Sequence, residues 1–369
     1  MLERKEFLTE QIITYLGNKR NLLSFIDSAV QIVRAELQSD KIDAFDVFSG
    51  SGIVARYLKQ YSNNLYVNDL EDYCKTINEC YLMNENDIDF SALQYWFNHI
   101  NRLLTDQPLI QNGFIARLYA PVDDAEIKHG ERVFYTTRNA QYIDTARTYL
   151  EEVPDPYKTL LLGPLLYEAS TKNNTSGVFK GFYKNSQTSV GQYGGNGQDA
   201  LQRILANIEL KLPVLSRNNC NVYVLQGDSN IICKDVPHVD LAYLDPPYNQ
   251  HPYSSNYFML NLINNYVEPK EISKVSGIPI GWNQSSYNKK SMALSSMKSL
   301  CENLNSSYIL VSYNSEGFIS YDEMVSLLQE FGDVRVFDKQ YNVFRGCRNL
   351  RDRDFYVKEY LFLLRKKEC

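Results

Sequence analysis

Four consecutive residues, Asp245-Pro246-Pro247-Tyr248, are the best equipped for chemistry in this chain. They follow an apolar run, residues 239–244, which predicts a buried strand. Because α/β folds bind their ligands beyond the carboxyl ends of parallel strands, the four residues are expected at a cleft. An acid, two rigid prolines and an aromatic ring in that place suit one chemistry: holding the exocyclic amino group of a flat heteroaromatic ring and methylating it.

The amino group of adenine illustrates why these residue types are needed. It is a poor nucleophile because its lone pair is delocalised into the ring. Asp245 and the backbone carbonyl of Pro246 can both accept its N–H hydrogens, which localises the lone pair on nitrogen. The prolines fix φ near about −65° and hold both acceptors still. Tyr248 offers a ring for stacking, typically worth ~1–3 kcal/mol per base. The alternative interpretation is a Pro-Pro turn after a strand.

Three further acids follow predicted strands. Asp46 opens the segment 46–52 (DVFSGSG), whose glycines let the backbone approach a ligand at the N-terminus of a helix. It is placed to hold an ammonium group. Asp69 comes about 20 residues later, where nucleotide-binding folds carry their ribose-binding acid. Asp228 ends a third strand. Each alone is explained as a cap or turn residue, but together they predict one polar site for a cation that contains adenosine.

Periodic patterns predict the elements that position these residues. Strands are expected at residues 44–48, 65–68, 222–226, 240–244, 308–313, 334–338 and 357–364. The first five favour βαβ units in a parallel sheet, and the last two favour an antiparallel hairpin at one edge. Helices are expected at residues 19–37, 52–61, 93–104, 137–151, 160–170, 199–210 and 320–331. The predicted fold class is α/β, with a mostly parallel sheet of seven strands.

The connection between the second and third strands is far longer than an ordinary crossover. We therefore expect an inserted, mainly helical lobe at residues 84–216, between two parts of one catalytic domain at residues 1–83 and 217–369. A chain of 369 residues is also too long for one ordinary core.

The net charge of −6 does not attract nucleic acid to the molecule as a whole, so such a partner requires local basic surfaces. Residues 169–198 contain no acid and interleave amides and aromatics with Lys172, Lys180 and Lys184. A second basic cluster consists of Arg345, Arg348, Arg351 and Arg353, and it follows Tyr341, which is also expected to contact nucleic acid. Such residues read base edges and clamp phosphates. A flexible surface loop and a solvated charge run are the alternative interpretations.

Other classes of site are not expected. The seven cysteines include no Cys-x-x-Cys pair and the four histidines lack metal-ligand spacing, so no metal site is predicted. The first ten residues are charged, and no run of about 18 apolar residues exists. We therefore expect no signal peptide, no transmembrane span and a cytoplasmic location.

With these residues identified, the chain resembles the alpha-group, Dam-like adenine-specific DNA methyltransferases over nearly its whole length. The resemblance rests on the segments 15–19 (YLGNK), 46–52 and 245–248, and on Asp69 and Asp228. It implies S-adenosylmethionine as methyl donor, bound by Tyr15, Gly17, Lys19, Asp46, Phe48, Gly50, Gly52, Asp69 and Asp228. It implies catalytic roles for Asp245, Pro246, Pro247 and Tyr248.

The resemblance also implies a Rossmann-like S-adenosylmethionine-dependent methyltransferase sheet, with the target-recognition domain in the insert. The target adenine would leave the duplex before its N6 amino group is methylated. Expected partners are double-stranded DNA and a cognate restriction endonuclease, with the chain acting as a monomer or weak dimer. Alternatives are an RNA adenine methyltransferase, a non-catalytic DNA-binding specificity protein, and a cytosine amino methyltransferase, a group that more often has Ser in place of Asp245.

Overall fold

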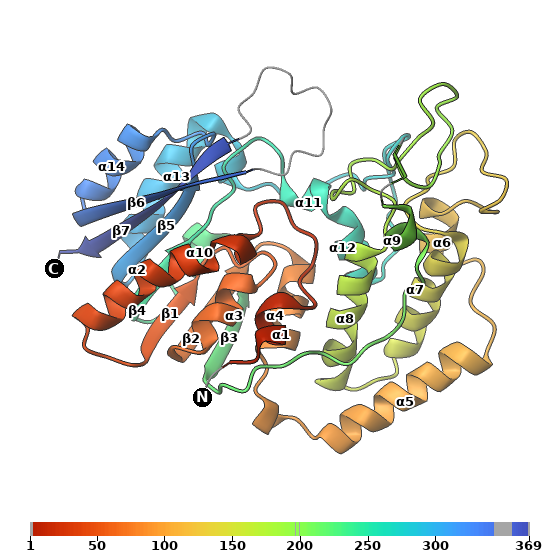
Figure 1. Cartoon of the computed structure of the whole chain (residues 1–369), viewed down its shortest axis with the longest axis horizontal. Helices are drawn as coiled ribbons and strands as arrows, with labels where there is room; N and C mark the ends of the chain where they lie inside the picture. The colour runs from red at the N-terminus through yellow and green to blue at the C-terminus, as the bar shows by residue number, and fades with distance from the viewer. Residues whose placement is uncertain (1–2, 196, 199, 343–355, 368–369) are drawn as a thin grey trace.

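The structure is a computed structural model that describes residues 3–195, 197–198, 200–342 and 356–367. Within these residues, seven strands form one mixed sheet in the order β3-β2-β1-β4-β5-β7-β6 (Figure 1). The strands are β1 (Ile42–Asp46), β2 (Ser62–Asp69), β3 (Asn221–Gln226), β4 (Val239–Leu244), β5 (Ser306–Asn314), β6 (Gly332–Asn342) and β7 (Tyr356–Lys366). The first five pair in parallel and the last two are antiparallel, which confirms the expected fold class.

The strand order creates a switch point between β1 and β4. From β1 the chain builds the sheet outward through β2 and β3, and then returns to place β4 on the other side of β1. In register, Asp46 at the end of β1 pairs with Tyr243, two residues before Asp245. Ligands of open α/β sheets bind at such a point, beyond the carboxyl ends of the strands.

Helices cover both faces of the sheet. One face carries α2 (Leu23–Glu36), α3 (Ile53–Lys59) and α4 (Asp72–Leu82). The other carries α10 (Ser229–Ile232), α13 (Lys290–Asn303) and α14 (Tyr321–Gln329). Alternation along β1 explains the two layers, because Ala44 belongs to the first core and Phe45 to the second. The start of α14 is fixed by a capping box between Ser320 and Glu323.

A group of helices lies to one side of the sheet (Figure 1). Between α4 and β3 the chain forms η2 (Glu85–Asp87), α5 (Phe90–Asp106), α6 (Phe114–Tyr119), α7 (Thr137–Leu150), α8 (Tyr157–Thr171) and α9 (Leu201–Leu205). Helix α8 packs closely on α4, where a Cβ added at Gly163 would lie 2.5 Å from the Cys80 sulfur. Leu160 and Leu161 of α8 belong to the same core cluster as Ala44 of the sheet. The mainly helical insert is thus built onto the sheet's own core, and its limits as a domain remain a prediction.

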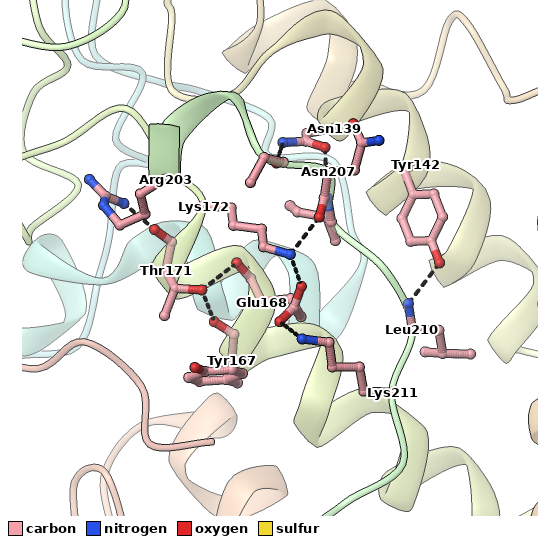
Figure 2. A network of polar contacts seen from close by, with 12 residues as sticks. Asn139, Tyr142, Tyr167, Glu168, Thr171, Lys172, Arg203, Asn207, Leu210 and Lys211 are labelled. Atoms are coloured by element: carbon pink, nitrogen blue, oxygen red, sulfur yellow. Dashed lines mark hydrogen bonds and ion pairs between the residues drawn. The ribbon is translucent and has the colours of Figure 1, made fainter. Parts of the chain in front are cut away.

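The helix expected at residues 199–210 is wrong beyond residue 205, because side chains from α7 bind the backbone that follows. Asn139 donates to the carbonyl of Ala206 at 2.9 Å and accepts from the amide of Ile208 at 2.9 Å. The Tyr142 hydroxyl accepts from the amide of Leu210 at 2.8 Å (Figure 2). These bonds hold the segment extended, so helix propensity loses to tertiary contacts.

Candidate active site

A cavity of about 890 Å³, including its open mouth, lies at the carboxyl ends of β1 to β4. Its lining contains most residues expected to bind a donor: Tyr15, Gly17, Lys19, Asp46, Phe48, Gly50, Asp69 and Asp228. Asp245 and Pro247 line the same cavity. Gly52, Pro246 and Tyr248 are the expected residues outside the lining. Segments far apart in sequence thus meet at one place, as the strand ends predict.

The turn after β1 depends on its glycines. Gly50 and Gly52 have φ of 49° and 75°, a left-handed conformation that favours glycine. A Cβ at Gly50 would lie 2.9 Å from the ring of Tyr15, and one at Gly52 would lie 2.7 Å from Oδ1 of Asn78. The Gly50 amide donates to Asp69 at 2.8 Å, which joins the turn to the end of β2. Gly52 therefore packs against Asn78 of α4, away from the cavity, while Gly50 lines the cavity.

Asp46 has the most unusual environment in the cavity. Its side chain is fully buried, and neither carboxyl oxygen has a hydrogen-bond partner among the described residues. Burial and the nearby carboxyls of Asp245 and Asp69 raise its pKa well above the usual value, although the backbone amides of Phe48 and Ala55 act in the opposite direction. A buried polar group without a partner is costly, and a cationic ligand would relieve that cost. The cavity therefore fits a ligand that carries an ammonium group.

Two further acids of the lining come from the end of β2 and the start of α4. Asp69 accepts from the amides of Gly50 and Glu71, at 2.8 and 3.0 Å, and burial raises its pKa. Glu71 was not expected at the site from the sequence. Its carboxylate accepts from Ser254 at 2.5 Å and from Asn261 at 2.6 Å, and burial raises its pKa to about 7. It ties α4 to the segment after the Asp245 motif.

The N-terminal segment is held over the cavity by tyrosines. The ring of Tyr15 stacks on Tyr253 and Tyr257, with centroids 4.8 and 4.7 Å apart. The Tyr257 hydroxyl accepts a hydrogen bond from the amide of Leu16 at 2.6 Å, and the Tyr253 hydroxyl donates one to the carbonyl of Leu16 at 3.2 Å. Tyr253 begins α11 (Tyr253–Asn256) and Tyr257 follows it directly. Neither tyrosine was expected at the site from the sequence, where their only signal is a pair of tyrosines four residues apart.

Asp245 is joined to a buried cation. Lys19, in η1 (Lys19–Leu22), places its Nζ 3.1 Å from Asp245 and 2.8 Å from Glu359. Burial acts against its charge, but Asp245 and Glu359 raise the pKa of Lys19 well above the usual value. Burial also raises the pKa of Asp245 to about 6; Lys19 lowers it and Glu359 raises it. The side chain of Asp245 remains 22% exposed. Lys19 thus lines the cavity as expected, but its charge is shared by two acids.

Tyr248 lies at the edge of this arrangement. Its ring is half-buried and packs against the core that contains Phe45. Pro246, in the same motif, is buried. The Tyr248 carbonyl accepts from the amide of Phe318 at 3.1 Å, which anchors the motif to the loop after β5. Burial raises the pKa of the Tyr248 hydroxyl, so it stays protonated at neutral pH.

The three expected DNA-binding lysines differ in environment. Lys172 is ion-paired with the buried Glu168, and its Nζ also donates to the carbonyl of Asn207 (Figure 2). Lys180 is exposed, with Nζ 3.2 Å from Nδ1 of His251, three residues after Tyr248. Lys184 is also exposed and lies over the ring of Phe182. Lys180 and Lys184 are therefore open to a partner, Lys180 beside the segment after the motif, whereas Lys172 is engaged within the protein.

The second basic cluster lies outside the described residues, and this holds for Arg345, Arg348, Arg351 and Arg353. Tyr341 lies in β6, where its backbone pairs with Val357. No helix in the described part of the chain has the length and apolar character needed to span a bilayer.

The chain is similar in sequence to known DNA methyltransferases. The model of the D12 class N6 adenine-specific DNA methyltransferase family matches residues 15–327. The chain is 28% identical to the type II methyltransferase M.NlaIII of Neisseria lactamica, covering 96% of this chain and 99% of that protein. It is 29% identical to the type II methyltransferase M.CviAII of Paramecium bursaria Chlorella virus 1, covering 95% and 98%. The modification methylase StsI of Streptococcus sanguinis is 25% identical over 96% of this chain and 52% of its own length.

Proposed function

The chain belongs to the D12 class N6 adenine-specific DNA methyltransferases, and from that premise we propose that its cavity binds S-adenosylmethionine beside the target adenine. Its reaction is the transfer of a methyl group to the N6 amino group of adenine in DNA. The observation that carries the proposal is the shared cavity: the carboxylate of Asp46, which has no hydrogen-bond partner within the described residues, and the partly exposed carboxylate of Asp245 line the same space.

When bound, S-adenosylmethionine supplies an electrophilic methyl group on a sulfonium centre. Asp46 would accept the donor's ammonium group, which gives its buried oxygens the partners they lack. Asp69 would face the ribose hydroxyls from the end of β2. Asp228 is exposed, caps α10 through Oδ1, and would contact the donor's adenine. Tyr15 and Gly17 would cover the donor from the N-terminal segment.

The target adenine has to leave the duplex, because pairing and stacking bury its amino group. Tyr248 would stack on the extruded base, while Asp245 and the Pro246 carbonyl accept its two N6 hydrogens. With a pKa of about 6, Asp245 is mostly ionised at neutral pH and is able to accept the proton that N6 loses. Holding both reactants in a near-attack pose can supply ~7–11 kcal/mol of the barrier.

The DNA would lie across the surface next to the motif. The amide of Phe179 donates to the carbonyl of Asn256 at 2.7 Å, so the acid-free segment 169–198 reaches the end of α11. Lys180 and Lys184 would there contact phosphates, and the arginines from Arg345 to Arg353 would add a second contact. Because relatives are named type II methyltransferases, the chain would serve as the methylating arm of a type II restriction–modification system in the cytoplasm, with a cognate endonuclease.

Substitution of Asp245 by alanine tests this assignment. We expect Asp245→Ala to lose methyl transfer from labelled S-adenosylmethionine to duplex DNA by about 10²–10⁴-fold, with donor binding retained in equilibrium dialysis. Asp240→Ala is the matched control, since Asp240 lies on β4, the strand that leads into Asp245, and accepts a hydrogen bond from the amide of Asp43 instead. Methyl transfer that survives in Asp245→Ala would remove this residue from the reaction.

A further inference from the structure

Glu359 on β7 is completely buried and lies beyond the region matched by the family model. Its Oε1 is 2.8 Å from Nζ of Lys19 and accepts a hydrogen bond from the Ser312 hydroxyl at 2.5 Å. Its Oε2 has no hydrogen-bond partner among the described residues. Burying a carboxylate costs desolvation free energy that its partners have to compensate. A buried carboxylate beside the candidate site is therefore a candidate for a functional role.

The antiparallel edge of the sheet explains how Glu359 reaches the site. Because β7 runs against β5, its beginning lies beside the end of β5, and Glu359 pairs with Asn314. The carboxyl ends of the parallel strands form the cavity. Because β7 is antiparallel to them, it contributes a side chain from near its N-terminal end. A parallel strand in the same place would present its last residues there instead.

Lys19 lies between two carboxylates and is closer to Glu359, at 2.8 Å, than to Asp245, at 3.1 Å. Its side chain is only 5% exposed, whereas that of Asp245 is 22% exposed. Glu359 therefore anchors the ammonium from the sheet side. Asp245 stays within ion-pair distance of the Lys19 ammonium, and its carboxylate still faces the cavity.

Among the residues that the structure describes, several ionisable groups face Asp245, and Lys19 is the one cation in that set. The groups are Lys19, Glu359, Asp46, Tyr243, Tyr248 and Tyr253. Lys19 lowers the pKa of Asp245, while Glu359 raises it. A proton acceptor works best when its pKa lies near the operating pH, and Glu359 opposes the effect of Lys19 that would move it away.

We propose that Glu359 is a positioning residue that holds the Lys19 ammonium on the sheet side of Asp245 and takes a share of its charge, so that Asp245 remains a strong acceptor for the adenine amino group. The inference rests on the proposed role of Asp245. In the reaction, N6 would form a bond to the methyl carbon as the carbon–sulfur bond of the sulfonium breaks and leaves its electron pair on sulfur, and the one proton that N6 loses would pass to Asp245.

The pH dependence of single-turnover methyl transfer tests the proposal, because Asp245 acts in its ionised form and the rate rises through its pKa. Glu359→Gln keeps the shape and removes the charge. Its acidic limb should move to lower pH than the wild-type limb near pH 6, with transfer at neutral pH reduced about 10-fold. Lys19→Met should move the limb to higher pH. Glu359→Asp retains the charge and should restore a limb close to that of the wild type.

A merely structural role for Glu359 would reduce the rate or the melting temperature without moving the acidic limb, and that result would overturn the proposal. If Glu359→Gln does not fold, the double variant Lys19→Met/Glu359→Gln removes both charges together, and its limb should lie below that of Lys19→Met alone. Equal limbs in those two variants would also overturn it. Activity that survives in Asp245→Ala would reject the proposed function itself, which keeps the two failures distinct.

Discussion

At the scale of single residues, the site is defined by acids whose ionisation is disfavoured before ligands arrive. Asp46 is the extreme case, because its buried carboxyl finds no hydrogen-bond partner in the described part of the chain and its pKa is raised well above the usual value. A group with a raised folded pKa contributes stability below its unfolded pKa and loses it as pH rises through the folded pKa. The donor-free protein therefore becomes less stable toward neutral pH on account of this residue.

Substitution of Asp46 by asparagine should separate binding from stability. Asp46→Asn is neutral at every pH and keeps nearly the same volume, so it removes the cost of burying an acid that would ionise in the unfolded chain; we therefore expect a higher melting temperature for the donor-free protein at neutral pH. Affinity for S-adenosylmethionine should fall about 10–100-fold, as expected for the loss of a charged hydrogen-bond partner. Thermal unfolding and equilibrium dialysis measure the two effects. A lower melting temperature together with unchanged affinity would contradict the assigned role.

Donor binding should also release a proton. An ammonium group favours the ionised form of Asp46, so this side chain would lose its proton as the donor binds. Affinity should consequently rise with pH up to the pKa of the donor-free residue. Calorimetry in two buffers with different ionisation enthalpies measures the release, and Asp46→Asn serves as control because it has no such proton. Equal binding enthalpies in both buffers would argue against this linkage.

At the scale of elements, much of the architecture follows from local patterns. The strands were predictable because apolar runs and alternation ended in turn signals, and the acids at their ends fell into one cavity. Residue contacts set by register were not predictable. Glu359 meets Lys19 only because β7 is antiparallel to β5. The end of α9 depends in the same way on Asn139 of another helix.

The turn after β1 offers a test at this scale. Gly52→Ala should destabilise the protein, since a left-handed alanine costs roughly 1–2 kcal/mol and its Cβ would also meet Asn78 at 2.7 Å. Gly130→Ala is the matched control, with φ of 95° and no atom within 4 Å of the added Cβ. Urea unfolding should show a larger loss for Gly52→Ala by about 1–3 kcal/mol, the usual cost of overpacking. Equal losses would mean that the turn tolerates the contact.

At the scale of the whole molecule, an acidic protein has to present a basic surface to DNA. The net charge is −6, and the sequence indicated residues 169–198 as one source of positive charge. In the structure the three lysines differ, because Lys172 is ion-paired with Glu168, which also pairs with Lys211, while Lys180 and Lys184 remain exposed. The sequence held a signal for this distinction, because Glu168 stands four residues before Lys172, but the helix expected at residues 160–170 ended before it could pair the two.

The salt dependence of DNA binding tests the difference between these lysines. Lys184→Ala should weaken binding to all sequences and reduce the slope of log affinity against log salt by about 1. Lys172→Ala should leave that slope unchanged. It removes one ion pair of the buried Glu168 and should therefore lower the stability of the protein. Fluorescence anisotropy over a salt series measures both. An unchanged slope in Lys184→Ala would place the DNA elsewhere.

Single-molecule sequencing of DNA from cells that express the protein reads the modified base and its sequence context together. We expect N6-methyladenine at one recurring sequence in cells with the wild-type chain, and none at that sequence in cells with Asp245→Ala at equal expression. Methylation of cytosine, or adenine methylation that persists in Asp245→Ala, would contradict the assignment of Asp245 and Tyr248 to an extruded adenine beside the donor cavity.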